Sequence, residues 1–331
     1  MARIAVFEAD DAAEIRRLKR SLRGHTLSFF PHPLTHENAS EASACDGIII
    51  FIYSRIDARL LSKLRKLRMI ATMSTGTDHI DMKACARRGI AISSVPAYGE
   101  HTVAEHTFAL MLAISRKLLP SVQRAKTGDF SLDGLAGFDL EGKTLGIIGT
   151  GRIGSHVVRL AHAFFMKPIA FARHPNPELV RLYGLEYVKS VGEILRRSDI
   201  VTLHAPLSKE TYHLINRKNI RKMKKGAIII NTARGGLVET EALLDGIKSG
   251  IIAYAGLDVL EEEGFIREER ELLSSSFRKR SDLRTVLGSH MLFKLDNVVI
   301  TPHNAFNSAE ALMKIVDVTA SSVNGFFKKG A

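Results

Sequence analysis

The sequence is poor in cysteine and has no tryptophan. Of its 331 residues only Cys45 and Cys85 are cysteines, and they stand in unrelated surroundings. They cannot form the disulfide framework of a small secreted domain, and no CxxC pair suggests zinc. No spacing of His, Asp and Glu points to a metal either. We therefore expect no metal site and a reducing compartment, the cytoplasm.

Long apolar runs are also missing. No segment approaches the roughly eighteen residues that a membrane-spanning helix needs. The first residues, MARIAVFEAD, hold a short apolar run that Glu8 and Asp10 interrupt. This pattern predicts a first strand rather than a signal peptide, so we expect no membrane segment and no membrane partner.

Positive charge is in excess, with a formal net charge of +12. Such an excess is compatible with nucleic-acid binding or with a basic enzyme that takes anionic ligands. The basic residues are spread along the chain, and no series of base-stacking aromatics accompanies them. We therefore expect anionic small molecules and no nucleic acid as partner.

The first hundred residues alternate between two periodicities. Strand-like apolar runs occupy residues 3–9, 47–53, 68–74 and 89–95. Segments with helical periodicity separate them, at residues 10–22, 57–67 and 78–89. This alternation predicts a parallel α/β sheet. An apolar helix is expected next at 100–119, ending before Pro120, and then an irregular stretch at 127–142.

A second α/β series follows in the remaining chain. Its strand-like runs lie at residues 143–148, 169–173, 198–206, 226–236, 253–263 and 297–303, and a helical tail covers 309–327. Polar residues 264–296 predict a surface excursion with some helix. Because one α/β unit precedes this series, we predict a cofactor domain at 100–298 inserted into an outer domain formed by 1–99 and 299–331.

The second series opens with a glycine-rich loop that matches GxGxxG. The loop comprises Gly149, Thr150, Gly151, Arg152, Ile153 and Gly154. A strand-like run precedes it and a helical run follows, as in dinucleotide-binding sites. There the glycines permit a tight turn and a close approach of pyrophosphate, and the helix N-terminus favours the phosphates. A plain strand-to-helix turn is the alternative.

No acidic residue follows the next strand. In an NAD-binding domain a carboxylate at that point accepts hydrogen bonds from the ribose 2′-hydroxyl and repels a 2′-phosphate. Here Ala172 takes its place, followed by Arg173 and His174. An arginine can bind phosphate with two parallel hydrogen bonds, so the sequence favours NADP(H) over NAD(H). Alternatively, Arg173 stacks on the adenine or points to solvent.

Three polar residues follow predicted strands of the second series, where ligands bind in open α/β sheets. Arg234 follows IIINTA, Glu263 follows AGLDVLEE and His303 follows VVITP. Each has an ordinary explanation as a loop cation, a solvated acid or a structural histidine. Their shared position downstream of a dinucleotide loop makes them the candidate catalytic residues.

At these motifs the sequence resembles the D-isomer-specific 2-hydroxyacid dehydrogenases. The resemblance covers nearly the whole chain through STGTDHIDM, VPAYGEHTVAEH, LGIIGTGRIG, HAPLSKETYHLI, INTARGGLVETEAL, AGLDVLEEE and TPHNAF. AYGEHTVAEH, TPHNAF and the long stretch between Glu263 and His303 are most similar to the D-lactate dehydrogenase branch. The resemblance implies a Rossmann-type cofactor domain inserted into a flavodoxin-like substrate domain, both doubly wound parallel sheets.

The resemblance also implies roles for individual residues. His303 would be the general acid/base, Glu263 would stabilise its charged form, and Arg234 would bind the substrate carboxylate and polarise the carbonyl. The substrate-binding residues would be Thr75, Gly76, Tyr98 and Phe306. Beside the glycine loop, the coenzyme would contact Arg173, His174, His204, Pro206, Thr232, Ala233 and, at its carboxamide, Asp258.

The implied activity is hydride transfer between NAD(P)H and a small 2-keto acid, yielding its D-2-hydroxy acid. Residues 52–54 should select the substrate side chain, but the sequence does not say which acid they select. A homodimer through the helix at 100–119 and the following loop is implied as well. A dinucleotide-sensing binding protein, like the corepressors that share this fold, is the alternative, although no Pro/Ser-rich tail is present.

Overall fold

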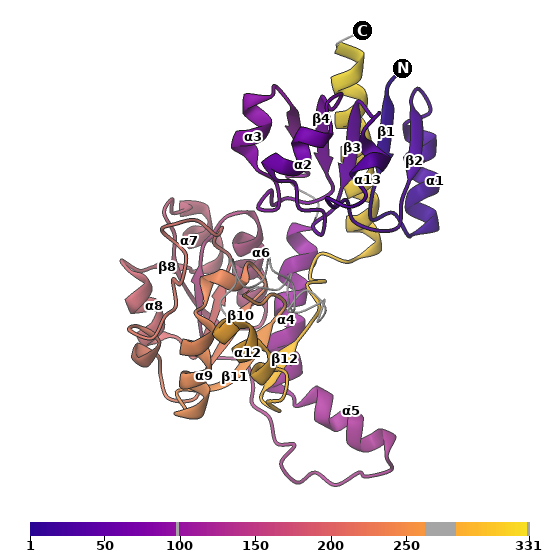
Figure 1. The fold of residues 1–331 in the computed structure, drawn as a ribbon. Coiled ribbons are helices and arrows are strands. Elements are labelled where there is room, and N and C mark those ends of the chain that lie inside the picture. Colours follow the sequence, from indigo (N-terminus) through magenta and orange to yellow (C-terminus); the bar gives the residue numbers. More distant parts are fainter. Residues whose placement is uncertain (97–98, 262–282, 330–331) are drawn as a thin grey trace. The chain divides into compact units, whose positions relative to one another are not determined.

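The computed structural model describes residues 1–96, 99–261 and 283–329, which divide into two units (Figure 1). The first unit comprises residues 1–99 together with 307–331, and the second comprises residues 100–306. The sequence predicts the return to the first unit at residue 299, whereas the chain returns at Asn307. The reason is that the strand β12 (Val298–Ile300) pairs with β11 (Ile252–Leu257) in the second unit.

The first unit is built on a five-stranded parallel sheet of order β2-β1-β3-β4-β5, the flavodoxin-like order. Its strands are β1 (Arg3–Val6), β2 (Thr26–Phe29), β3 (Gly47–Ile50), β4 (Met69–Thr72) and β5 (Ala91–Ser93). Fully buried β-branched residues fill β3, as expected for a strand covered on both faces. The strand β2 has no apolar run that would predict it from the sequence, because its side chains are only half-buried or exposed.

The helices of this unit are α1 (Ala12–Ser21), η1 (Ala39–Ala42), α2 (Ala58–Lys63), α3 (Met82–Arg87) and the long α13 (Ala309–Lys329). Aspartate side chains accept a backbone hydrogen bond at the start of α1, α2 and α3, which fixes where these helices begin. The C-terminal helix α13 packs on α1, where Arg17 forms two hydrogen bonds of 2.6 Å with Asp317. The chain's last helix therefore completes the unit that its first strand begins.

The second unit contains a seven-stranded parallel sheet of order β12-β11-β10-β9-β6-β7-β8. Besides β11 and β12, its strands are β6 (Thr144–Ile148), β7 (Lys167–Phe171), β8 (Glu186–Tyr187), β9 (Ile200–Leu203) and β10 (Ala227–Asn231). The order reverses between β6 and β9, which is where ligands bind in such sheets. The two-residue strand β8 is too short to be recognised in the sequence.

Helices cover both faces of this sheet (Figure 1). They are α4 (Glu100–Ser115), α6 (Arg152–Ala163), α7 (Pro177–Tyr183), α8 (Val191–Arg197), η2 (Ile220–Lys222), η3 (Gly235–Leu237), α9 (Thr240–Lys248) and α12 (Leu283–Leu292). A further helix, α5 (Leu118–Lys126), has no buried residue. One apolar cluster packs α4 and α6 on the sheet through Phe108 and Val157, and another packs α8 and α9 through Leu195 and Leu243.

The apolar helix expected at 100–119 is two helices. It breaks at Lys117, which adopts a left-handed conformation with φ 52°. Pro120 does not end the helix, because it lies in the first turn of α5, where the missing N–H costs nothing. Within the described residues, no helix has both the length and the apolar character needed to cross a membrane.

Candidate active site

The glycine loop joins β6 to α6 with the geometry that its sequence predicts. Gly149 has φ 97°, and a Cβ there would lie 2.6 Å from the carbonyl oxygen of His204. A Cβ on Gly154 would lie 2.0 Å from the carbonyl oxygen of Gly149, so this position requires close packing. A Cβ on Gly151, in contrast, would meet nothing within 4 Å. The loop therefore packs tightly against the protein at Gly149 and Gly154, and it leaves space for a ligand at Gly151.

The start of α6 supplies the electrostatics of this loop. Gly151 is the N-cap and has no side chain with which to bind the first N–H groups of the helix. These groups and the helix dipole favour an anion. Arg152 is largely exposed and approaches Glu100 at 3.6 Å, whereas Ile153 is half-buried. The loop thus fits the pyrophosphate of a dinucleotide.

The loop after β7 carries the residues that replace the missing acid. Ala172 is half-buried, and Arg173 and His174 are both exposed. Arg173 is close enough to Glu210 to help lower the pKa of that carboxyl, after the larger effects of hydrogen bonds from Ser208 and the backbone. A cation and an acid thus occur together near this strand end, although no acid follows β7 in the sequence.

His204 and Pro206 follow β9, next to the glycine loop in the sheet. The Nε2 atom of His204 lies 2.9 Å from the Thr202 hydroxyl, and its buried Nδ1 has no hydrogen-bond partner among the described residues. Burial lowers the pKa of His204 to about 3, so its imidazole is neutral. Pro206 is exposed, and its carbonyl accepts a hydrogen bond from Thr211. This edge offers a neutral surface beside the phosphates.

Arg234 follows β10 and is held in place by a residue that the sequence analysis does not single out. The buried amide of Asn231 donates to the carbonyl of Arg234 at 2.9 Å and accepts from the N–H of Ala233 at 3.1 Å. The Arg234 side chain is half-buried and donates to the Ala233 carbonyl at 2.7 Å. Thr232, also buried, contacts the Thr107 hydroxyl on α4 at 2.9 Å.

Asp258 follows β11 and organises the neighbouring strand end. Its Oδ1 accepts hydrogen bonds from the Thr301 hydroxyl at 2.5 Å and the Asn304 N–H at 3.0 Å. Its Oδ2 accepts from the Ala305 N–H at 3.0 Å. His106 on α4 lies 3.5 Å from Oδ1 and 3.0 Å from the Thr301 hydroxyl. Asp258 therefore fixes the loop that carries His303.

His303 follows β12 within that loop. It is half-buried and has φ 55°, a left-handed conformation that is unusual for a residue other than glycine. Its N–H donates to the Thr301 carbonyl at 2.9 Å, which closes a tight turn around Pro302. Such strain is typical of functional residues that their surroundings hold in place. Phe306, also half-buried, ends the same loop.

The candidate Glu263 lies outside the described residues, as does Tyr98. The first acid of the same run, Glu261, is buried and belongs to a different network. Its carboxylate lies 2.6 Å from Nε2 of His213 and accepts hydrogen bonds from the Thr240 N–H and hydroxyl at 2.7 and 2.6 Å. Glu261 therefore holds the start of α9.

In the first unit, Thr75 and Gly76 follow β4. The Thr75 hydroxyl donates to the Val95 carbonyl at 2.8 Å, and the Ser74 hydroxyl donates to the Gly76 carbonyl at 2.7 Å. The backbone N–H groups of Thr75 and Gly76 donate to no acceptor in the part of the chain that the structure describes. Two successive N–H groups in such a turn form a concave site for an anion.

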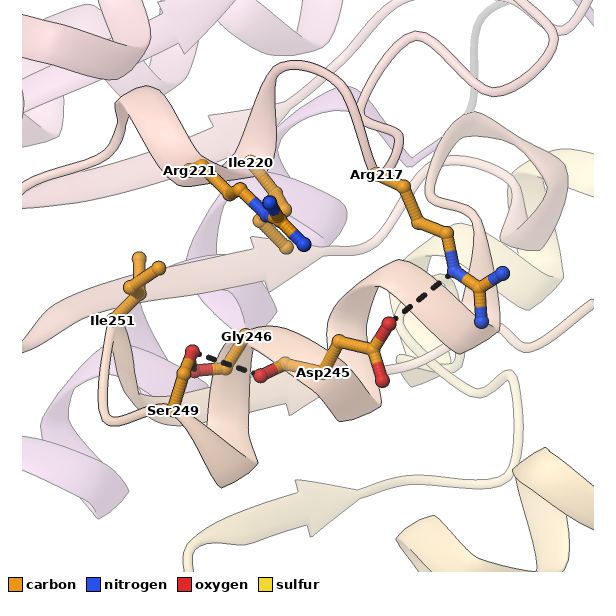
Figure 2. Close-up of a pocket in the computed structure, with 7 residues that line it drawn as sticks. All are labelled: Arg217, Ile220, Arg221, Asp245, Gly246, Ser249 and Ile251. Carbon is orange, nitrogen blue, oxygen red and sulfur yellow. Dashed lines mark hydrogen bonds and ion pairs between the residues drawn. The ribbon is translucent and has the colours of Figure 1, made fainter.

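A cavity of about 190 Å³ lies elsewhere in the second unit, between η2 and α9 (Figure 2). Figure 2 shows Arg217 directed toward Asp245, with Nε 3.2 Å from the carboxylate. Ile251, which immediately precedes β11, places the cavity at the amino edge of the sheet, opposite the glycine loop. Its volume is below the usual range for ligand pockets, so we do not assign the coenzyme to it. Among the described residues, no cluster of His, Cys, Asp and Glu could hold a metal ion.

Comparisons with known proteins agree with this arrangement. Residues 108–305 match the family model described as D-isomer specific 2-hydroxyacid dehydrogenase, NAD binding domain. The D-lactate dehydrogenase of Escherichia coli is 34% identical over 307 residues, which cover 92% of this chain and 90% of that protein. The glyoxylate reductase of Thermococcus litoralis is 36% identical over 290 residues, which cover 86% of this chain and 81% of that protein.

Solved structures extend the similarity to the whole fold. The crystal structure of D-lactate dehydrogenase from Aquifex aeolicus, in complex with NAD and lactic acid, matches with a TM-score of 0.87 and 34% identity. The match covers 98% of this chain and 96% of that chain.

Proposed function

The chain belongs to the D-isomer-specific 2-hydroxyacid dehydrogenases, on the D-lactate dehydrogenase-like branch, and we propose that it reduces small 2-keto acids with NADPH as the preferred coenzyme. It is a nicotinamide-dependent oxidoreductase that acts on 2-hydroxy acids. One observation carries the proposed reaction. Arg234, Asp258 and His303 follow three neighbouring strands, β10, β11 and β12, in the same sheet as the glycine loop.

Residues of the second unit have separate roles in the reaction of the substrate. When bound, the nicotinamide supplies the hydride. Arg234 binds the substrate carboxylate and polarises the carbonyl, and His303 donates a proton to the carbonyl oxygen as negative charge develops there. Glu263 would hydrogen-bond to His303 and favour its charged form.

The remaining contacts orient the two ligands. The N–H groups of Thr75 and Gly76 would bind the substrate carboxylate as well, and Tyr98 and Phe306 would shape the side-chain pocket. Among the described residues, Asp258 Oδ2 accepts a hydrogen bond from the Ala305 N–H, and its remaining acceptor capacity would serve the nicotinamide carboxamide. Thr232 and Ala233 would line the nicotinamide, and His204 and Pro206 would border the dinucleotide.

The preference for NADPH rests on Ala172 and the two exposed residues after it. Without a carboxylate at residue 172, nothing at that position repels a 2′-phosphate, and Arg173 and His174 can donate hydrogen bonds to it. We expect Ala172→Asp to lower kcat/KM for NADPH much more than for NADH. An unchanged ratio of the two values would contradict this placement of the 2′-phosphate.

The first test is the initial rate of NADPH and NADH oxidation, measured in parallel with pyruvate and with glyoxylate. We expect turnover with both acids and a higher kcat/KM with NADPH. Faster turnover with NADH would refute the coenzyme preference and leave the reaction class intact. Coenzyme binding without turnover of these or bulkier 2-keto acids would favour a dinucleotide sensor instead.

The role of His303 is tested separately. His303→Asn removes the proton donor but keeps the size of the side chain, so we expect kcat to fall by about 10²–10⁴-fold. Coenzyme affinity, measured by calorimetry, should remain within a few-fold of wild type. A near-wild-type kcat would exclude His303 as the acid.

We further propose a cytoplasmic homodimer. Exposed apolar side chains gather on α5 and the segment after it, with Phe130 and Leu132 80% and 82% exposed. Figure 1 shows this segment extended away from the sheet of the second unit. A second copy of the chain would cover it. Replacing Phe130 and Leu132 by serine should yield monomers in analytical ultracentrifugation, and an unchanged dimer would exclude this surface.

A further inference from the structure

A tyrosine hydroxyl connects the glycine loop to the loop that carries Arg173 and His174. Tyr187 Oη accepts a hydrogen bond from the N–H of Asn176 at 2.9 Å. The same oxygen lies 2.9 Å from the hydroxyl of Thr150. Since Tyr187 Oη accepts from Asn176, its own proton is available to Thr150. One phenol group therefore holds two loops that are far apart in the sequence.

The strand order explains how Tyr187 reaches both loops. In the sheet, β6, β7 and β8 are consecutive, and Tyr187 is aligned with Ala170 on β7, which is aligned with Ile147 on β6. The Tyr187 side chain thus spans the end of β7 to meet Thr150, which is buried in the glycine loop. A shorter side chain on β8 could not make this connection.

The loop at 172–176 is short and is fixed at both ends. It begins where β7 ends, and Asn176 is the N-cap of α7, with its side chain accepting from the Glu178 N–H at 2.9 Å. Pro175 and Pro177 restrict the backbone on either side of Asn176. The hydrogen bond that the Asn176 N–H donates to Tyr187 Oη, together with the contact of Oη with Thr150, then ties the far end of this loop to the glycine loop.

We propose that Tyr187 is a positioning residue for the adenosine end of the coenzyme. Its hydroxyl holds the loop so that Arg173 and His174 stay beside the ribose while the pyrophosphate occupies the glycine loop. The inference rests on the proposed coenzyme site, and it adds that specificity for the 2′-phosphate depends on a residue of the edge strand β8. Tyr187 itself contacts neither the phosphate nor the substrate.

The test is Tyr187→Phe, which removes the hydroxyl and keeps the ring. The dissociation constants of NADPH and NADH are measured by calorimetry in the absence of substrate. We expect NADPH to bind about tenfold more weakly and the dissociation constant of NADH to change less than about threefold. The reason is that the loop that carries Arg173 and His174 loosens, and these residues bind the 2′-phosphate that only NADPH has. Tyr183→Phe on α7 is the matched control, since no hydrogen bond of the Tyr183 hydroxyl occurs among the described residues.

A double-mutant cycle separates positioning from a general loss of structure. Thr150→Val removes the other partner, and coupling between Tyr187→Phe and Thr150→Val in NADPH affinity is expected. Equal weakening of both coenzymes, or no weakening of either, would overturn the inference. A wild-type protein that binds NADH more tightly would refute the coenzyme preference and, with it, the part of the inference that concerns the 2′-phosphate. Weaker NADH binding by Tyr187→Phe would then still support positioning of the adenosine end by Tyr187.

Discussion

Each unit places a carboxylate after a strand and uses it to hold the loop that follows a neighbouring strand. In the first unit Glu8, after β1, accepts hydrogen bonds from the N–H groups of Phe51, Tyr53 and Ser54 at 3.0–3.2 Å and from the Ser54 hydroxyl. In the second unit Asp258, after β11, holds residues 301–305 in the same way. Similar sheets thus organise the loops at their carboxyl edges by similar means.

The two carboxylates differ in their electrostatic surroundings. His106 lies 3.5 Å from Asp258, so a potential cation is in contact with this acid. Glu8 lies among acids, because Asp10, Asp11 and Glu8 all help to raise the pKa of Glu14. Burial raises the pKa of Glu8 itself despite the hydrogen bonds that it accepts. The two carboxylates therefore hold similar loops in different surroundings: a histidine contacts Asp258, whereas burial disfavours the charged form of Glu8.

The largest effect should come from Asp258→Asn. The amide NH₂ of the new side chain would face the N–H groups of Asn304 or Ala305, which would leave buried donors unpaired. We therefore expect the unfolding free energy of the second unit to fall by about 2–4 kcal/mol. Loosening of the His303 loop should also lower kcat by at least about tenfold. Calorimetry and steady-state kinetics measure both effects. Asp245→Asn, at a half-exposed ion pair on α9, is the control, and equal stability of the two variants would refute the comparison.

Glu8→Gln should cost less, about 1–2 kcal/mol, because the fold already disfavours the charged form of Glu8. Hydrogen exchange followed by mass spectrometry should show faster exchange in residues 51–54, with β1 still protected. The exposed Glu37→Gln is the control in the same unit. Unchanged exchange in residues 51–54 would show that Glu8 does not hold this loop.

The stabilities of the two units should respond to pH in opposite directions. Burial, followed by repulsion from Asp11, Asp10 and Glu8, raises the pKa of Glu14 from 4.5 to about 7. The folded first unit therefore binds this proton more tightly than the unfolded chain does. The resulting stabilisation is fully present below pH 4.5 and is lost as the pH rises toward 7. Burial lowers the pKa of His204 from 6.5 to about 3, so stability of the second unit present above pH 6.5 is lost as the pH falls toward 3.

Between pH 4.5 and 6.5, each group should change stability by at most about 1.4 kcal/mol per pH unit, with opposite signs. Glu14→Gln should flatten the pH dependence of the first unit only, and His204→Gln that of the second unit only. Hydrogen exchange resolved by peptide across this range measures both. If either substitution changed the pH dependence of both units alike, the assignment of these pH effects to Glu14 and His204 would be wrong.

The smallest effect should come from Glu210→Gln. Removing this acid near Arg173 should increase the preference for NADPH by about two- to threefold at low salt. The change should disappear in about 0.5 M salt, because the groups are exposed. Glu141→Gln, just before β6 at the opposite edge of the sheet, is the control. A change that persists in high salt would mean that Glu210 acts through a direct contact.

Sequence periodicity was sufficient for the alternating architecture and for the glycine loop, because buried parallel strands and a GxGxxG turn leave local signals. It also indicates Arg234 and His303, since each follows an apolar run, whereas Asp258 was expected only from the family resemblance. The two missed strands, β2 and β8, lack such runs. The break at Lys117 has no local signal either, because a lysine does not by itself predict a left-handed backbone conformation.

The residues that hold the site together were beyond sequence analysis for another reason. His106 meets Thr301, and Tyr187 meets Thr150, through contacts between segments far apart along the chain. Asn231, Glu8 and Glu261 likewise act through hydrogen bonds that depend on the strand order. A polar residue acquires such a role only when the sheet brings its partners to the same edge.

The return of the chain to its first unit has a consequence for biosynthesis. Helix α13 packs on α1 and β4, and Phe327 lies against Gly47 on β3, so the first sheet lacks this cover until residues 309–329 have been synthesised. The second unit emerges from the ribosome earlier and has its own apolar clusters. The segment synthesised first is therefore the last to be completed.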